Sequence, residues 1–173
     1  MDDARRASGI FIRAGVDRAS DGERVAFLDS LGRGFDEVGR PPMSLIMLGI
    51  DGFAQLACVE GRHVARHALA WIASAARACT RPGDVVHRVD VDQLAVVVRR
   101  RHDAQAEGLI VRVRRAVGAA HGRDDAIAAL PIPLVVGFAH ASEAASATEL
   151  CVLAESRMHE QKLRAILPVR QAG

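Results

Sequence analysis

The chain has 173 residues, of which 50% are hydrophobic, and its 23 basic and 21 acidic residues give a net charge of +2. This composition supplies the core of a single domain, and the near balance of charge gives no reason to expect nucleic-acid binding. Cys58, Cys79 and Cys151 form no CxxC pair and no even set of disulfides, and no apolar run approaches the roughly 18 residues that a membrane helix needs. We therefore predict a cytoplasmic protein without a membrane span.

The N-terminal half of the chain predicts a helix, a buried strand and two further helices. Apolar residues recur at helical spacing over Asp21–Val38, whereas Met43–Ile50 is a continuous apolar run of strand length. The Ala-rich segment Gly52–Thr80 predicts a short helix and a longer helix that are separated at Gly61. Residues 1–20 are expected to form a separate N-terminal segment or the end of a signalling helix.

The C-terminal half predicts two hairpin strands, a helix, another strand and a last helix. In chain order these elements are the strand pair Val85–Arg99 with its turn at Asp90–Asp92, the helix His102–Ala120, the strand Ile132–Ala141 and the helix Ala144–Leu163. This order fits an α/β (α+β) fold in which helices cover a central, mostly antiparallel sheet. We expect one domain over residues 21–167 and a short tail over residues 168–173.

A loop with the sequence Arg81-Pro82-Gly83-Asp84 is the first candidate site. Pro-Gly is a natural turn pair, and a turn here would present the Arg81 guanidinium and the Asp84 carboxylate on the same side. Guanine carries acceptors at O6 and N7 that suit an arginine, and donors at N1 and N2 that suit a carboxylate. An RxxD turn can therefore bind guanine, although the same residues also suit an exposed ion pair at a helix-to-strand connection.

The hairpin turn Asp90-Val91-Asp92-Gln93-Leu94 follows this loop after five residues. Two glycines at such a turn would allow positive φ and a close approach of the backbone to a phosphate chain. Val91 does not allow this, because a β-branched residue is disfavoured at positive φ and its side chain fills the space that a triphosphate needs. The hairpin is therefore predicted to form without a phosphate-binding turn.

Together, the RxxD loop and the turn five residues later resemble the signature region of GGDEF domains, the family of diguanylate cyclases. Four other segments resemble parts of this family in the same order; they are Arg24–Leu28, Gly49–Phe53, Val136–Ala139 and Ala154–Lys162. The resemblance implies a nucleotide-cyclase-like fold with a five-stranded sheet flanked by helices. It also implies that the turn has degenerated, because the family has Gly-Gly, an acid, Glu and Phe at the positions of Asp90 to Leu94.

The resemblance implies in addition that this chain is not a cyclase. Members of the family bind two metal ions through an Asp at the end of the first strand and an acid in the turn, but the first position here is Gly49, which has no ligating side chain. Asp92 matches the acid of the turn, and Lys162 matches a phosphate-binding position. The remaining positions implied in catalysis or GTP binding have changed; they are Ala54, Ala57, Arg66, Gln93 and Ile166. We expect no catalytic residue, no metal and no cofactor.

Two weaker metal hypotheses stay open on the sequence. Asp51 and Asp92 would lie near neighbouring strand ends and could share a metal ion, although Asp51 is more simply explained as the cap of the following helix. His63 and His67 are spaced by one helical turn with Glu60 nearby, but a zinc site needs a third ligand and supporting partners. Neither pattern by itself predicts a metal site.

In the GGDEF family the RxxD loop is the product-inhibition site for cyclic di-GMP, so the resemblance implies that this ligand binds Arg81 and Asp84. It also implies an arginine from the helix after the hairpin, for which Arg112 is the best match, and a basic residue before the turn, here Arg88. The leading hypothesis is a cyclic di-GMP receptor that acts on a protein partner or on a second copy of itself. The alternatives are a ligand-independent interaction or dimerisation module, and a domain that binds GTP without turnover.

Overall fold

A computed structural model describes residues 21–36, 42–99, 103–121, 130 and 132–166. In chain order its elements are α1 (Asp21–Asp36), β1 (Met43–Ile50), α2 (Phe53–Val59), α3 (Arg62–Cys79), β2 (Val85–Arg88), β3 (Gln93–Arg99), α4 (Asp103–His121), β4 (Leu134–His140), the 3-10 helix η2 (Ala141–Glu143) and α5 (Ala147–Ile166). The expected N-terminal segment and the tail lie outside the described residues. No described helix is both long and apolar enough to cross a membrane.

The sheet has the strand order β2-β3-β1-β4, and every neighbouring pair is antiparallel. The predicted α+β class with helices around an antiparallel sheet is confirmed. The resemblance implied five strands, and the described residues form four. β1 is paired on both sides and covered on both faces, which explains why all eight of its residues are buried.

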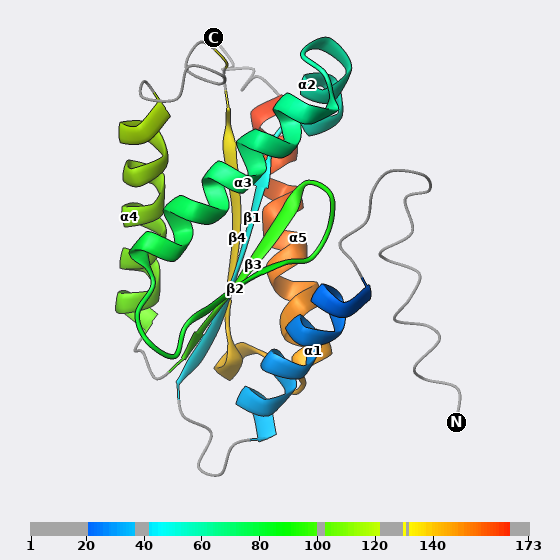
Figure 1. Cartoon of the computed structure of the whole chain (residues 1–173). Helices are drawn as coiled ribbons and strands as arrows, with labels where there is room; N and C mark the ends of the chain where they lie inside the picture. Colours follow the sequence, from blue (N-terminus) through cyan, green and yellow to red (C-terminus); the bar gives the residue numbers. More distant parts are fainter. Residues whose placement is uncertain (1–20, 37–41, 100–102, 122–129, 131, 167–173) are drawn as a thin grey trace, which may run out of the picture.

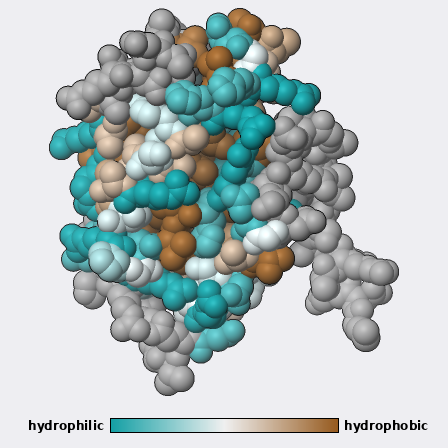
Figure 2. Space-filling view, viewed as in Figure 1, coloured by the Kyte–Doolittle hydropathy of each residue, from teal (hydrophilic) through white to brown (hydrophobic). Residues whose placement is uncertain are grey.

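Helices cover both faces of this sheet (Figure 1). Alternate residues of β1 point to opposite faces, so Ile46 and Leu48 enter the core under α2, α3 and α4, while Leu45 and Met47 enter the core under α1 and α5. Across the face seen in Figure 2, hydrophilic residues lie between smaller patches of apolar residues. The two helical layers therefore enclose two apolar cores, one on each side of the sheet.

A glycine sets the distance between α5 and the sheet. A Cβ atom on Gly137 in β4 would lie 1.9 Å from the carbonyl oxygen of Ala154 and 2.7 Å from the backbone nitrogen of Met158. No real side chain can occupy that space. Gly137, which lies in the segment Val136–Ala139 that resembles the family, is thus required by the close packing of α5.

Side chains also bind the outward-facing backbone groups of β4. The four hydrogen bonds run from Arg114 Nη1 to Leu134 O (3.3 Å), from the Val136 N–H to Gln161 Oε1 (2.5 Å), from Arg157 Nη1 to Phe138 O (2.7 Å) and from the His140 N–H to Glu143 Oε2 (2.8 Å). On the outer side of an edge strand, the backbone N–H and C=O groups have no neighbouring strand to bind. Here side chains form the hydrogen bonds that a further strand would otherwise provide.

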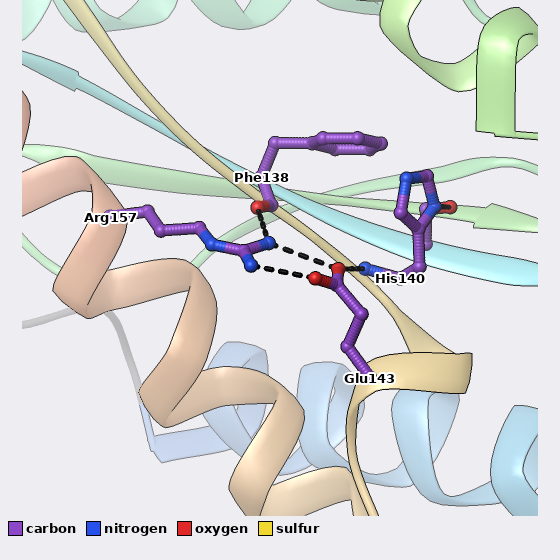
Figure 3. Close-up of polar contacts among 5 residues, drawn as sticks. Phe138, His140, Glu143 and Arg157 are labelled. Atoms are coloured by element: carbon purple, nitrogen blue, oxygen red, sulfur yellow. Dashed lines mark hydrogen bonds and ion pairs between the residues drawn. The ribbon is translucent and has the colours of Figure 1, made fainter.

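Arg157 and Glu143 form a clamp between α5 and the end of β4 (Figure 3). Arg157 Nη2 lies 2.6 Å from Glu143 Oε1, and Nη1 donates to Oε2 at 3.0 Å. The hydrogen bond from Arg157, followed by that from the His140 N–H, lowers the pKa of Glu143 to about 2. This bidentate pair fixes the approach of α5 to the sheet.

One predicted helix start and one predicted helix cap were wrong. The last helix begins at Ala147 rather than Ala144, because Ser146 Oγ accepts the Glu149 N–H (3.1 Å) and Glu149 Oε2 accepts the Ala145 N–H (2.7 Å). Asp51 does not cap α2. The N-cap residue of α2 is Gly52, which has φ 67°, and no side chain forms a cap hydrogen bond there. The predicted break at Gly61 is confirmed, and this residue has φ 94°.

Candidate functional site

The RxxD loop connects α3 to β2 and forms a closed turn. The Asp84 N–H donates to the Arg81 carbonyl at 3.0 Å, and Gly83 has φ 97°, which suits glycine. The carboxylate of Asp84 is fixed by two backbone donors, because Oδ2 accepts the Arg81 N–H (3.0 Å) and Oδ1 accepts the Arg99 N–H at the end of β3 (3.2 Å). The loop is therefore tied both to itself and to the neighbouring strand.

The Arg81 side chain is not used by the fold around it. Arg81 is exposed, and its guanidinium forms no hydrogen bond or ion pair with any residue that the structure describes. Arg112 is also exposed, on α4, which packs beside α3 (Figure 1). The structure thus places the loop at the end of α3 and Arg112 on the same helical layer.

Arg88 does not lie with these residues. It stands at the other end of β2, where its Nε donates to Asp90 O (3.2 Å) and its Nη2 donates to Val91 O (3.1 Å). A guanidinium that binds two carbonyls of the hairpin turn is directed away from the RxxD loop. The structure therefore gives Arg88 a role in the turn and does not bring it to the site with which the resemblance associated it.

The hairpin turn is held by contacts within the chain. Asp90 Oδ1 accepts the Val91 N–H at 2.7 Å, and the N–H groups of Val89 and Asp90 both donate to Gln93 O. Val91 is half-buried and packs against the core below α2 and α3. No glycine is present here to open the backbone, so the turn is filled by its own side chains.

Gly49 lies directly beneath this turn, in β1 between Gln93 and Val135 of the neighbouring strands. A Cβ atom at Gly49 would lie 3.3 Å from Asp92 O and 3.5 Å from Met158 Sδ. A carboxylate at this position would therefore need neighbouring atoms to move. Leu94, the last residue of the turn motif, is buried in the sheet.

The residues of this region do not fit a two-metal site. Gly49 offers no ligand, and Asp92 Oδ2 lies 3.9 Å from Lys162 Nζ, so the acid of the turn pairs with the lysine that matches a phosphate-binding position. Within the described ranges no three His, Cys, Asp or Glu side chains are grouped so that they could hold a metal ion, and this includes the surroundings of His63 and His67. Mg²⁺ sites use one or two carboxylates with substrate phosphates, and here one carboxylate is missing and the other is paired.

Glu155 is a buried acid that the sequence analysis did not identify. It is 6% exposed on α5. Burial is the main cause that raises its pKa to about 7; the charge of Arg24 opposes this shift, and the charge of Asp90 adds to it. Glu155 lies one residue after Ala154 and three before Met158, both of which are buried. The helical spacing of these apolar residues could therefore have predicted that Glu155 is buried.

Comparisons with known proteins agree with this geometry. The family model described as "Diguanylate cyclase, GGDEF domain" matches residues 22–165. The GGDEF domain of YfiN from Pseudomonas aeruginosa is 22% identical, with a TM-score of 0.69 over 82% of this chain and 89% of that one. The GGDEF domain of DgcB from Caulobacter crescentus, solved in complex with c-di-GMP, is 20% identical, with a TM-score of 0.71 over 88% and 94%.

A third structure, of the diguanylate cyclase SiaD from Pseudomonas aeruginosa with its activator SiaC, is 20% identical, with a TM-score of 0.72 over 82% of this chain and 55% of that chain. At these identities the structures show a shared fold. The chain has no match among curated proteins.

Proposed function

Because this chain belongs to the GGDEF domain family, we propose that it is a catalytically inactive member that binds cyclic di-GMP through Arg81, Asp84 and Arg112. Ligand binding then changes how the chain interacts with a protein partner or with a second copy of itself. Two structural neighbours motivate this proposal, since DgcB was solved with c-di-GMP and SiaD with an activator protein. We also propose that the protein is located in the cytoplasm.

The state of the RxxD loop is the observation that carries the proposal. Asp84 is held by two backbone N–H groups, and Arg81 is exposed without a partner among the described residues. Each carboxylate oxygen can accept more than one hydrogen bond, so the two backbone donors do not by themselves exclude hydrogen bonds from N1 and N2 of guanine to Asp84. A carboxylate already fixed in place lowers the ordering cost of binding.

The proposed loss of cyclase activity is supported at the other end of the hairpin. Gly49 has no carboxylate, Val91 packs into the core where the family has glycine, and Asp92 pairs with Lys162. A triphosphate and its metal ions would have to displace these contacts without a full ligand set to replace them. The same features argue against GTP binding without turnover.

The test is a nucleotide panel on the wild-type chain, on Arg81→Ala and on Arg77→Ala. Arg77 is a matched control, because it is an exposed arginine in the last turn of α3, next to the loop. We expect cyclic di-GMP, but not GTP or cyclic di-AMP, to raise the melting temperature of the wild type and of Arg77→Ala, and this shift to disappear in Arg81→Ala. Titration calorimetry without heat for cyclic di-GMP, or product formed from GTP and Mg²⁺, would overturn the proposal.

A ligand-independent interaction module is the second candidate, and one feature of α1 favours it. Val25 and Leu28 are 64% and 49% exposed, and they lie one helical turn apart on the outer face of this helix. In this case Val25→Glu with Leu28→Glu would abolish self-association in sedimentation experiments, whereas Arg81→Ala would leave it unchanged.

A further inference from the structure

Arg99, the last residue of β3, contacts two separate parts of the molecule. Its backbone N–H donates to Asp84 Oδ1 in the RxxD loop at 3.2 Å. Its guanidinium crosses to the α1 side of the sheet, where Nη2 donates to the carbonyl oxygen of Ser30. One residue therefore joins the proposed ligand loop, through its main chain, to α1, through its side chain.

His87 of β2 lies in the same contact. Its ring packs edge-on against Phe27 of α1, with 5.8 Å between ring centroids. Burial, and then the charge of Arg99, lowers the pKa of His87, so the ring is neutral at pH 7. The contact between α1 and the hairpin thus combines one charged side chain, one neutral imidazole and one phenyl ring.

This contact is not fully satisfied. Arg99 Nε and His87 Nε2 are buried, and neither has a hydrogen-bond partner in the part of the chain that the structure describes. Buried polar atoms without partners reduce the stability of the arrangement that buries them. These two atoms therefore make the packing of α1 on the sheet less stable than the apolar contacts of Phe27 and Leu31 alone would make it. A small change at Arg99 can then alter how firmly α1 is bound to the sheet.

We propose that Arg99 couples ligand occupancy of the RxxD loop to the docking of α1. The inference rests on the proposed function, because the ligand in question is cyclic di-GMP. A guanine that binds Asp84 adds to the hydrogen bonds that already hold its carboxylate, which further restrains the Arg99 backbone at the end of β3 and keeps the guanidinium on Ser30 O. Ligand binding then tightens α1 on the sheet, and by thermodynamic linkage a loosened α1 weakens ligand binding by the same factor.

The first experiment measures hydrogen exchange of the α1 amides with and without cyclic di-GMP, with titration calorimetry on the same samples. In the wild type we expect exchange to slow severalfold on ligand binding. Arg99→Met keeps the backbone N–H to Asp84 and much of the side-chain length but removes the bond to Ser30. It should bind the ligand within about threefold of wild type and show no change in α1 exchange.

Arg33→Met is the matched control. Arg33 is an exposed arginine on α1 whose ion pair with Asp29 (2.7 Å) stays within the helix, so this variant should keep the ligand-induced slowing. Reciprocity is tested with Leu31→Ala, which removes a buried anchor of α1. It should weaken cyclic di-GMP binding about fivefold in the wild-type background and not at all in Arg99→Met. If Leu31→Ala does not fold, the milder variant Phe27→Leu is used in its place to loosen α1.

The outcomes separate the two proposals. No binding of cyclic di-GMP to the folded wild type overturns the proposed function and this inference with it. Binding that leaves α1 exchange unchanged in the wild type, or changes it equally in Arg99→Met, overturns the coupling and leaves the receptor function standing.

Discussion

At one end of the β2–β3 hairpin, the charged side chains are bound by the protein itself. Arg88 donates to two carbonyls of the turn, and Asp92 pairs with Lys162 above the side-chain-free Gly49. At the other end, the loop that precedes β2 holds Asp84 through backbone donors and leaves the Arg81 guanidinium exposed. The two ends belong to one structural unit, yet they offer a ligand very different surfaces.

The comparison shows that charge content alone does not identify a binding site. Both ends carry an arginine and an aspartate, so they look alike in the sequence. They differ in what satisfies these groups, because a side chain already paired inside the fold must lose that partner before it can bind a ligand. Four predictions follow from this difference.

The largest effect is expected from an attempt to restore the missing acid. Gly49→Asp places a carboxylate in a buried strand against Asp92 O and Met158, and we expect a loss of about 3 to 5 kcal/mol in the free energy of unfolding. Urea denaturation with and without Mg²⁺ measures this. Gly49→Ala, which adds only a methyl group, is the control and should cost about 1 to 2 kcal/mol. Stabilisation of Gly49→Asp by Mg²⁺ would show that the turn end is still a metal site.

A pH effect is expected at the same end, from Glu155. Its pKa is about 7 in the fold against an ordinary value of 4.5, so between these pH values the native state holds a proton that the unfolded state has lost. Stability therefore falls as the pH rises from about 4.5 to about 7, and stays at the lower level above it. Glu155→Gln removes this loss and should be more stable than wild type at pH 8 by up to about 3 kcal/mol.

The check is thermal unfolding of Glu155→Gln across this pH range. Glu160→Gln, an exposed neighbour on the same helix, should follow the wild-type curve. Equal stability of Glu155→Gln and wild type at both ends of the range would mean that the buried carboxylate is ionised and compensated in the fold.

Asparagine substitutions compare the two ends directly. Asp84→Asn and Asp90→Asn each weaken a carboxylate that accepts backbone N–H groups, so both should lose about 1 kcal/mol of stability. Only Asp84→Asn should also lose cyclic di-GMP affinity, by about 2 kcal/mol, because only this carboxylate is proposed to bind guanine. Calorimetric affinities that are equal for the two variants would assign Asp84 a purely structural role.

The smallest effect is expected for Arg88→Met. The variant loses two hydrogen bonds to the turn carbonyls, at a cost of about 1 kcal/mol in stability, and keeps cyclic di-GMP affinity within about twofold of wild type. A tenfold loss of affinity, measured by the same titration, would return Arg88 to the ligand site and remove the distinction between the two ends.

The element types could be predicted because their signals are local. The unbroken apolar run of β1 and the helical period of α1 follow from residues within each segment. The start of α5 was missed even though its signal was present, since Ser146 and Glu149 have the spacing of a capping box. The resemblance implied a fifth strand, whereas the described residues form the four strands that the sequence pattern indicated.

The candidate site was predictable only in part. Pro82 and Gly83 indicate a turn from adjacent residues, so the RxxD loop could be placed from the sequence. The bond between Asp84 and Arg99, and the pair between Asp92 and Lys162, depend on how strands and helices meet. The resemblance associated Arg88 with the ligand, and only the three-dimensional arrangement shows that its guanidinium points to the turn.

The outer edge of β4 determines how copies of this protein can meet. An uncovered edge strand can recruit a strand from another molecule and so extend a sheet from one chain into the next. Here Arg114, Gln161, Arg157 and Glu143 already occupy backbone groups along this edge. Sheet growth through β4 would have to break all four bonds, so this edge is protected against the strand addition that leads to fibrous aggregation.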